Sequence, residues 1–112
     1  MKKYSDDFTT LPTEVVDKIT EAVNEQGCTP ILICRETNHP EDNKLFVVIA
    51  RYNEPNNSFD NAYVVWNANT FGDKASLFYG HYYISFKSAL EIVADKVRNL
   101  NKEEIYFNNE VM

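Results

Sequence analysis

Long apolar segments, glycine-rich loops and an excess of basic residues are all absent from this chain of 112 residues. Its longest apolar run is Leu45–Ala50, whereas a membrane-spanning helix needs about 20 apolar residues. The three glycines lie far apart, so no loop has the glycine-rich composition that cradles nucleotide phosphates. The 17 acidic residues outnumber the 11 basic ones and leave a net charge of −6. We therefore expect neither insertion in a membrane nor direct binding to nucleic acid.

Cysteine and histidine are also scarce, with two of each. Cys28 and Cys34 are too far apart for a Cys-x-x-Cys zinc clip, and His39 and His81 have no spacing that suits metal ligands. Cys34 and His81 could form a nucleophile and base only if the fold made them neighbours, and a cysteine among β-branched residues is usually a buried apolar group. We therefore expect no metal, no cofactor and no catalytic residue, which argues against an enzyme.

Two features of the sequence bear on where the protein works. Two cysteines are too few for a secreted domain built on disulfide bonds. The segment Met1–Asp7 is polar where a secretory signal would have its apolar stretch. We expect a cytoplasmic protein with free thiols.

The apolar pattern predicts a helix at each end of a series of strands. Val16, Ile19 and Val23 recur at helical spacing, and Gly27 suits a left-handed C-terminal cap. The capping-box form Ser88-Ala89-Leu90-Glu91 opens the second helix, although Ser85 is also a suitable cap. The predicted segments are a loose lead-in (1–10), a helix (12–26), strands (31–35, 44–52, 62–67 and 77–85), a helix from residue 85 or 88 to 100, and a polar tail (101–112) in which residues 105–107 either dock on the core or fray.

These elements predict one α+β domain over residues 1–112. Short loops join consecutive strands, which implies an antiparallel sheet of about four strands. We expect the N-terminal and C-terminal helices to pack on one face of it, in the order α-β-β-β-β-α. The strand over 44–52 is apolar on both of its faces, so something must also cover the second face. In the last strand, Gly80 predicts a bulge or a close backbone approach.

A cluster of aromatic residues is the first candidate binding surface. Simple alternation places Leu77, Tyr79, His81 and Tyr83 on one face of the last strand, beside Trp66 on the strand before it. Tyrosine and tryptophan offer a broad rigid contact area with a polar tip, which favours recognition surfaces. We expect Trp66, Tyr79, His81 and Tyr83 to contact a partner, and ordinary packing between strands is the alternative.

An acidic helix face is the second candidate. Asp17, Glu21 and Glu25 follow one another at intervals of four residues, with Glu14 nearby. Their rise of about 6 Å per step is close to the spacing of phosphates along a nucleic-acid strand. Such a face can occupy a groove meant for DNA or RNA, while a solvated helix surface explains the same pattern.

The second half of the chain resembles small uncharacterised proteins of bacterial phages and mobile genetic elements. The likeness is carried by Tyr63-Val64-Val65-Trp66, by Gly80-His81-Tyr82-Tyr83, and by Phe86 and Ala89-Leu90 at the start of a helix. The resemblance implies a context in which small acidic proteins inhibit or modulate a host protein, including antagonists of restriction and CRISPR systems. It implies no role for any particular residue.

The sequence thus predicts a small non-enzymatic protein that binds another macromolecule, with a protein as the expected partner. Two alternatives remain open at this point. One is an acidic nucleic-acid mimic that blocks a DNA- or RNA-handling enzyme. The other is a small-molecule binder or enzyme with a pocket around His81.

Overall fold

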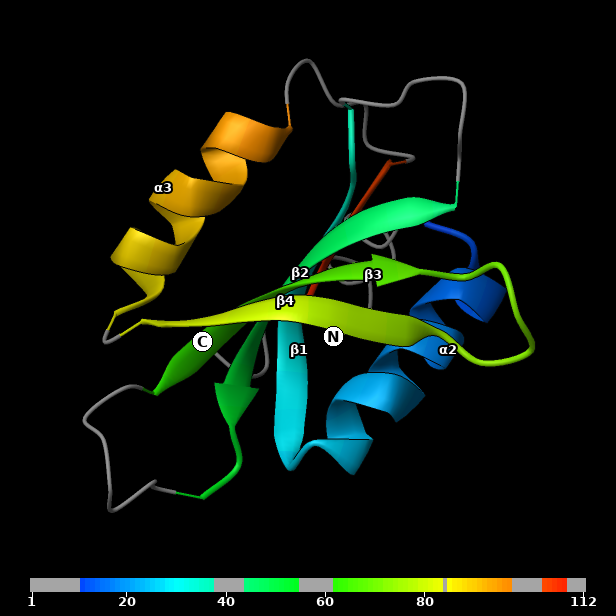
Figure 1. Cartoon of the computed structure of the whole chain (residues 1–112), viewed down its shortest axis with the longest axis horizontal. Coiled ribbons are helices and arrows are strands. Elements are labelled where there is room, and N and C mark those ends of the chain that lie inside the picture. Colours follow the sequence, from blue (N-terminus) through cyan, green and yellow to red (C-terminus); the bar gives the residue numbers. More distant parts are fainter. Residues whose placement is uncertain (1–10, 38–43, 55–61, 84, 98–103, 109–112) are drawn as a thin grey trace, which may run out of the picture.

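The computed structural model describes residues 11–37, 44–54, 62–83, 85–97 and 104–108. Its elements are α2 (Thr13–Glu25), β1 (Cys28–Arg35), β2 (Leu45–Tyr52), β3 (Tyr63–Asn69), β4 (Ser76–Tyr83), α3 (Phe86–Lys96) and β5 (Ile105–Phe107). The strands form one antiparallel sheet in the order β4-β3-β2-β1-β5 (Figure 1). The α+β class and the two flanking helices are confirmed, with five strands where about four were expected.

The two helices lie on opposite faces of the sheet, so the expectation that both pack on one face was wrong (Figure 1). Phe46, Val48 and Ala50 of β2 belong to the core under α2. Val47 and Ile49, which alternate with them, belong to the core under α3. A strand that is apolar on both faces leaves one face in water unless each has its own cover. Helix α3 covers the second face of β2.

Residues 105–108 dock on the side of β1 that faces away from β2. Ile105 of β5 pairs with Cys34, and Tyr106 pairs with Ile33. The Asn108 amide donates to the carbonyl of Ile31 at 2.7 Å. Of the two outcomes left open for residues 105–107, docking is the one observed. The lead-in over 1–10 and the rest of the tail, residues 101–103 and 109–112, lie outside the described residues.

The helix ends follow from local chemistry. Gly27 has φ +77°, which confirms the left-handed residue expected after α2. At the start of α3 the Ser85 hydroxyl accepts a hydrogen bond from the Ser88 amide at 3.1 Å, so Ser85 and not Ser88 is the cap. Val97 is already extended, and α3 therefore ends at Lys96, four residues before the expected end.

Two strands are longer than the local pattern predicts. β1 begins at Cys28 and includes Pro30, which cannot donate to a sheet ladder and lies where the pairing with β2 shifts by one residue. β3 continues to Asn69, because Ala68 and Asn69 pair with the start of β2. The additional residues of β1 and β3 are extended because they pair with β2, so the local composition of each strand does not predict them.

Candidate functional site

A bulge in β4 brings the backbone of that strand against the single tryptophan. Asn67 pairs with Phe78 and Val65 pairs with His81, so Tyr79 and Gly80 together face Trp66. A Cβ atom on Gly80 would lie 2.7 Å from the indole Nε1 of Trp66. Both features expected of Gly80, a bulge and a close approach, are confirmed.

The bulge changes which residues of β4 share a face. Before it, Leu77 pairs with Ala68 on the face covered by α2. After it, His81 pairs with Val65 on the face covered by α3. One extra residue reverses the alternation, so the expected single face of Leu77, Tyr79, His81 and Tyr83 was wrong.

The four residues expected to form the aromatic surface are therefore not brought together. Trp66 is buried in the core under α2, whereas His81 is exposed and follows the register of the opposite face. Tyr79 lies at the bulge itself and is strongly exposed. The Tyr83 backbone pairs with Tyr63. Tyr79 and His81 remain accessible for binding, and Trp66 is a structural residue.

Tyr79 and Tyr82 of β4 face solvent, with 72% and 54% of their area exposed. Tyr79 has φ +59°, a left-handed backbone conformation that strains a bulky residue. Its ring meets that of Phe78 edge to face at a centroid distance of 5.1 Å. Simple alternation places Tyr82 on the face opposite Tyr79, so Tyr82 was not among the predicted binding residues. Gly80, which marks the bulge, was the signal that could have indicated it.

Tyr82 forms a second exposed aromatic contact, with Tyr52 of β2. The two rings stack at 6.1 Å with an angle of 14° between their planes. Burial and the neighbouring Tyr82 hydroxyl raise the pKa of Tyr52 above its ordinary value of 10.0. The Tyr52 hydroxyl is thus neutral at pH 7 and can donate or accept a hydrogen bond.

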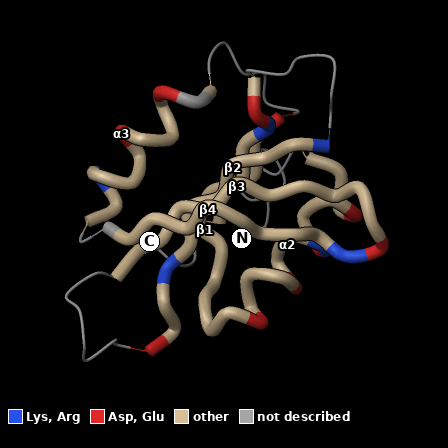
Figure 2. The backbone as a smooth tube through the Cα atoms, viewed as in Figure 1, with Lys and Arg blue, Asp and Glu red and all other residues tan. Residues whose placement is uncertain are grey.

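Strand β4 is also one of the two edge strands of the sheet in the part of the chain that the structure describes. Its eight residues, Ser76–Tyr83, include no lysine, arginine, carboxylate or proline, and the tube of Figure 2 is uncoloured by charge along it. Edge strands normally carry such residues because an open row of backbone donors and acceptors invites pairing with another chain. Here only the bulge interrupts the edge.

The acidic face of α2 is present as the sequence analysis expected. Glu14, Asp17, Glu21 and Glu25 are all exposed, on the side of the helix away from its buried residues. Glu25 lies 3.8 Å from Lys74 of the loop before β4, an exposed ion pair worth little energy. The other three carboxylates form no ion pair with the described part of the chain. Glu14 also lies at the rim of a pocket.

Cys34 and His81 do not form a nucleophile and base. Cys34 is on β1 and His81 on β4, and two strands lie between them. Burial raises the pKa of the Cys34 thiol from 9.0 to about 12 and that of Cys28 to about 11, so both are neutral and weakly nucleophilic at pH 7. Both cysteines are free, and they belong to the cores on opposite faces of the sheet.

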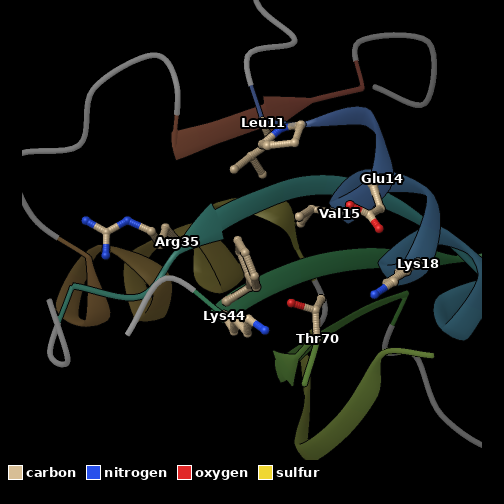
Figure 3. A pocket seen from close by; sticks show the side chains of 9 residues that line it. Leu11, Glu14, Val15, Lys18, Arg35, Lys44 and Thr70 are labelled. Carbon is tan, nitrogen blue, oxygen red and sulfur yellow. The ribbon is translucent and has the colours of Figure 1, made fainter. Parts of the chain in front are cut away.

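A pocket of about 370 Å³ lies between the first turns of α2 and the ends of β1, β2 and β3 (Figure 3). Its lining consists of Leu11, Pro12, Glu14, Val15, Lys18, Arg35, Lys44, Phe46 and Thr70. His81 is not among these residues, so this pocket is not the one that the small-molecule alternative placed around that imidazole. The lining comes from four separate segments of the chain, so no local sequence pattern indicates the pocket.

Comparisons with protein-family models, curated proteins and solved structures gave no match to this chain. Among the described residues, no three histidine, cysteine or acidic side chains come together in a way that could hold a metal ion. His39 lies outside them. No helix in the described ranges is long and apolar enough to cross a membrane. The candidate sites are thus the β4 edge, the acidic face of α2 and the pocket.

Proposed function

We propose that this protein is a non-enzymatic binding protein whose partner, another protein, adds an extended segment to the edge of β4. The observation that carries the proposal is an edge strand of eight residues without lysine, arginine or carboxylate, on which Tyr79 and Tyr82 are exposed. Backbone hydrogen bonds along such an edge supply affinity for any extended segment, and the side chains that flank it select the sequence.

Tyr79 is the residue that we expect to contribute most to this interaction. A large exposed aromatic side chain contributes contact area with little loss of conformational freedom. Its backbone is held in a left-handed conformation that most side chains avoid, and strain of this kind persists where the rest of the fold imposes it. Both properties support a role in recognition.

The class of partner that we propose comes from the resemblance in the second half of the chain. Small acidic proteins of phages and mobile elements are often inhibitors or modulators that bind a host protein. A domain whose edge strand accepts a segment of that host protein can do this without any catalytic group of its own. The partner would be a cytoplasmic host protein with an extended segment free to pair.

Tyr79→Asn separates binding from folding. Asparagine tolerates a left-handed backbone, so relief of strain offsets the lost contact with Phe78, and we expect stability within about 1 kcal/mol of the wild type. Binding to the partner should weaken at least tenfold, about 1.4 kcal/mol. The partner is first captured with the tagged protein from nuclease-treated bacterial lysate, and its Kd is then measured with purified components.

Phe71→Asn is the matched control, because Phe71 is exposed in the turn between β3 and β4 but does not belong to the edge strand. It should leave the Kd unchanged. A Tyr79→Asn variant that retains the partner as tightly as the wild type would rule out recognition through this part of β4.

The acidic face of α2 favours a second candidate, a nucleic-acid mimic that blocks a DNA- or RNA-handling enzyme. The observation behind it is the exposure of Asp17, Glu21 and Glu25 at one carboxylate per helical turn. If this candidate is correct, lysine at all three positions should abolish capture of the partner, and capture by the wild type should weaken steeply with salt. Edge pairing predicts capture that persists in high salt and survives the charge reversal.

A further inference from the structure

We propose that the pocket beside the first turn of α2 binds the carboxylate or phosphate group of a small molecule (Figure 3). The site is formed by Lys18 of α2, Lys44 before β2 and Thr70 after β3. It goes beyond binding at the β4 edge and does not use Tyr79 or Tyr82.

Thr70 is the polar group at the base of this site. Its side chain is only 6% exposed, and Figure 3 shows its hydroxyl directed into the pocket. The Thr70 amide donates to the carbonyl of Lys44 at 3.1 Å, but its hydroxyl makes no hydrogen bond within the part of the chain that the structure describes. No described side chain has a buried polar atom without a partner, so this hydroxyl reaches the open space of the pocket. It can therefore donate its proton to a bound oxyanion in place of water.

Two ammonium groups give the site its charge. In Figure 3 the side chains of Lys18 and Lys44 extend toward Thr70 from different sides. The Nζ atom of Lys18 also donates to the carbonyl of Gly72 at 3.2 Å, which holds it near the turn that follows Thr70. Two lysine ammonium groups on either side of this hydroxyl favour an anion as the ligand, since each can donate a charge-assisted hydrogen bond to it.

The other two charged residues of the lining, Arg35 and Glu14, do not reverse the preference for an anion. Arg35 is paired with Glu104, and its guanidinium group extends away from the centre of the pocket in Figure 3. Glu14 lies at the exposed rim, where its carboxylate disfavours large polyanions that would reach it. A small ligand with one anionic group at Thr70 avoids that repulsion.

The start of α2 strengthens the preference for an anion. Its cap is Pro12, which has no side-chain hydrogen bond to the first turn of the helix. The amides at the start of a helix carry partial positive charge and favour negative groups nearby. Because α2 has 13 residues, this contribution is that of a full helix, although Glu14 in its first turn offsets part of it.

The apolar part of the lining determines what else the ligand carries. Leu11, Val15 and Phe46 form this wall, and they continue into the core under α2. The volume of about 370 Å³ is in the range of pockets that hold small organic molecules. The ligand class is therefore a small apolar molecule with a single carboxylate or phosphate group.

The test titrates the ¹⁵N-labelled full chain with inorganic phosphate, and separately with acetate, at constant ionic strength maintained with chloride. We expect saturable shifts of the Thr70 and Lys18 amide signals, with the tighter of the two anions identifying the group that the site prefers. Lys18→Gln and Thr70→Val should each weaken the binding of that anion at least tenfold. Lys18 is partly exposed, so its variant stays folded even if Thr70→Val does not.

Lys87→Gln is the matched control, because it removes one exposed lysine from α3 on the opposite face of the sheet. It should leave the affinity for both anions unchanged. Equal weakening by Lys87→Gln and Lys18→Gln would show that the anions respond only to net charge, and this would overturn the proposal. Shifts that do not saturate, or that do not include Thr70, would overturn it as well.

Discussion

Ala89→Asp is expected to destabilise the protein by at least about 3 kcal/mol, a large share of the stability of a domain of this size. Ala89 is fully buried on α3, in the core that Val47, Ile49 and Val65 form on that face of the sheet. An aspartate there would be a charge without a partner in an apolar environment. The loss should be visible as a lower midpoint in urea unfolding followed by circular dichroism.

Leu90→Asp provides the control at the next position of the same helix. Leu90 is 41% exposed, so its aspartate can remain hydrated and should cost no more than about 1 kcal/mol. The comparison tests the placement of α3 directly, because it is the packing of this helix on the second face that makes Ala89 buried. Similar losses for the two variants would contradict that placement.

Gly80→Ala is expected to cost about 2 to 3 kcal/mol, since it places a methyl group 2.7 Å from the indole Nε1 of Trp66. The indole is buried in the core under α2 and has little room to move away. Urea unfolding measures the loss. Because the chain has one tryptophan, its fluorescence also reports whether the indole has shifted toward water.

Gly72→Ala is the matched control for this substitution. A Cβ atom on Gly72 would meet backbone atoms of Lys74 no closer than 3.6 Å, which is an ordinary contact. Its stability and its fluorescence should stay close to those of the wild type. If Gly80→Ala were equally neutral, the close approach of β4 to Trp66 would not be a feature of the folded protein in solution.

The elements that the sequence predicted best are those with a strong pattern of their own. Val16, Ile19 and Val23 define the buried stripe of α2, and its observed bounds, Thr13–Glu25, differ from the predicted ones by a single residue at each end. The turn after it depends on Gly27, whose left-handed backbone follows from its lack of a side chain. Such features depend on residues a few positions apart, which the sequence shows directly.

The aromatic surface was predicted less well because one inserted residue exchanges the two faces for all later residues of the strand. Regular alternation holds in β4 up to Phe78 and resumes at His81 with the two faces exchanged. Gly80 indicated a bulge, but the sequence did not show that two residues of β4 would face Trp66. The correct exposed set, Tyr79 with Tyr82, could be read only once the register with β3 was known.

The sequence by itself determined the α+β class, the order of the two helices and the first four strands, and the absence of a long apolar segment. Only the tertiary structure decided that α2 and α3 cover opposite faces, that β4 is an edge, and that Lys18, Lys44 and Thr70 line one pocket. The reason is physical. The conformation of a segment depends largely on its own residues, whereas faces, edges and pockets depend on which distant segments pair, and that is set by the packing of the whole chain.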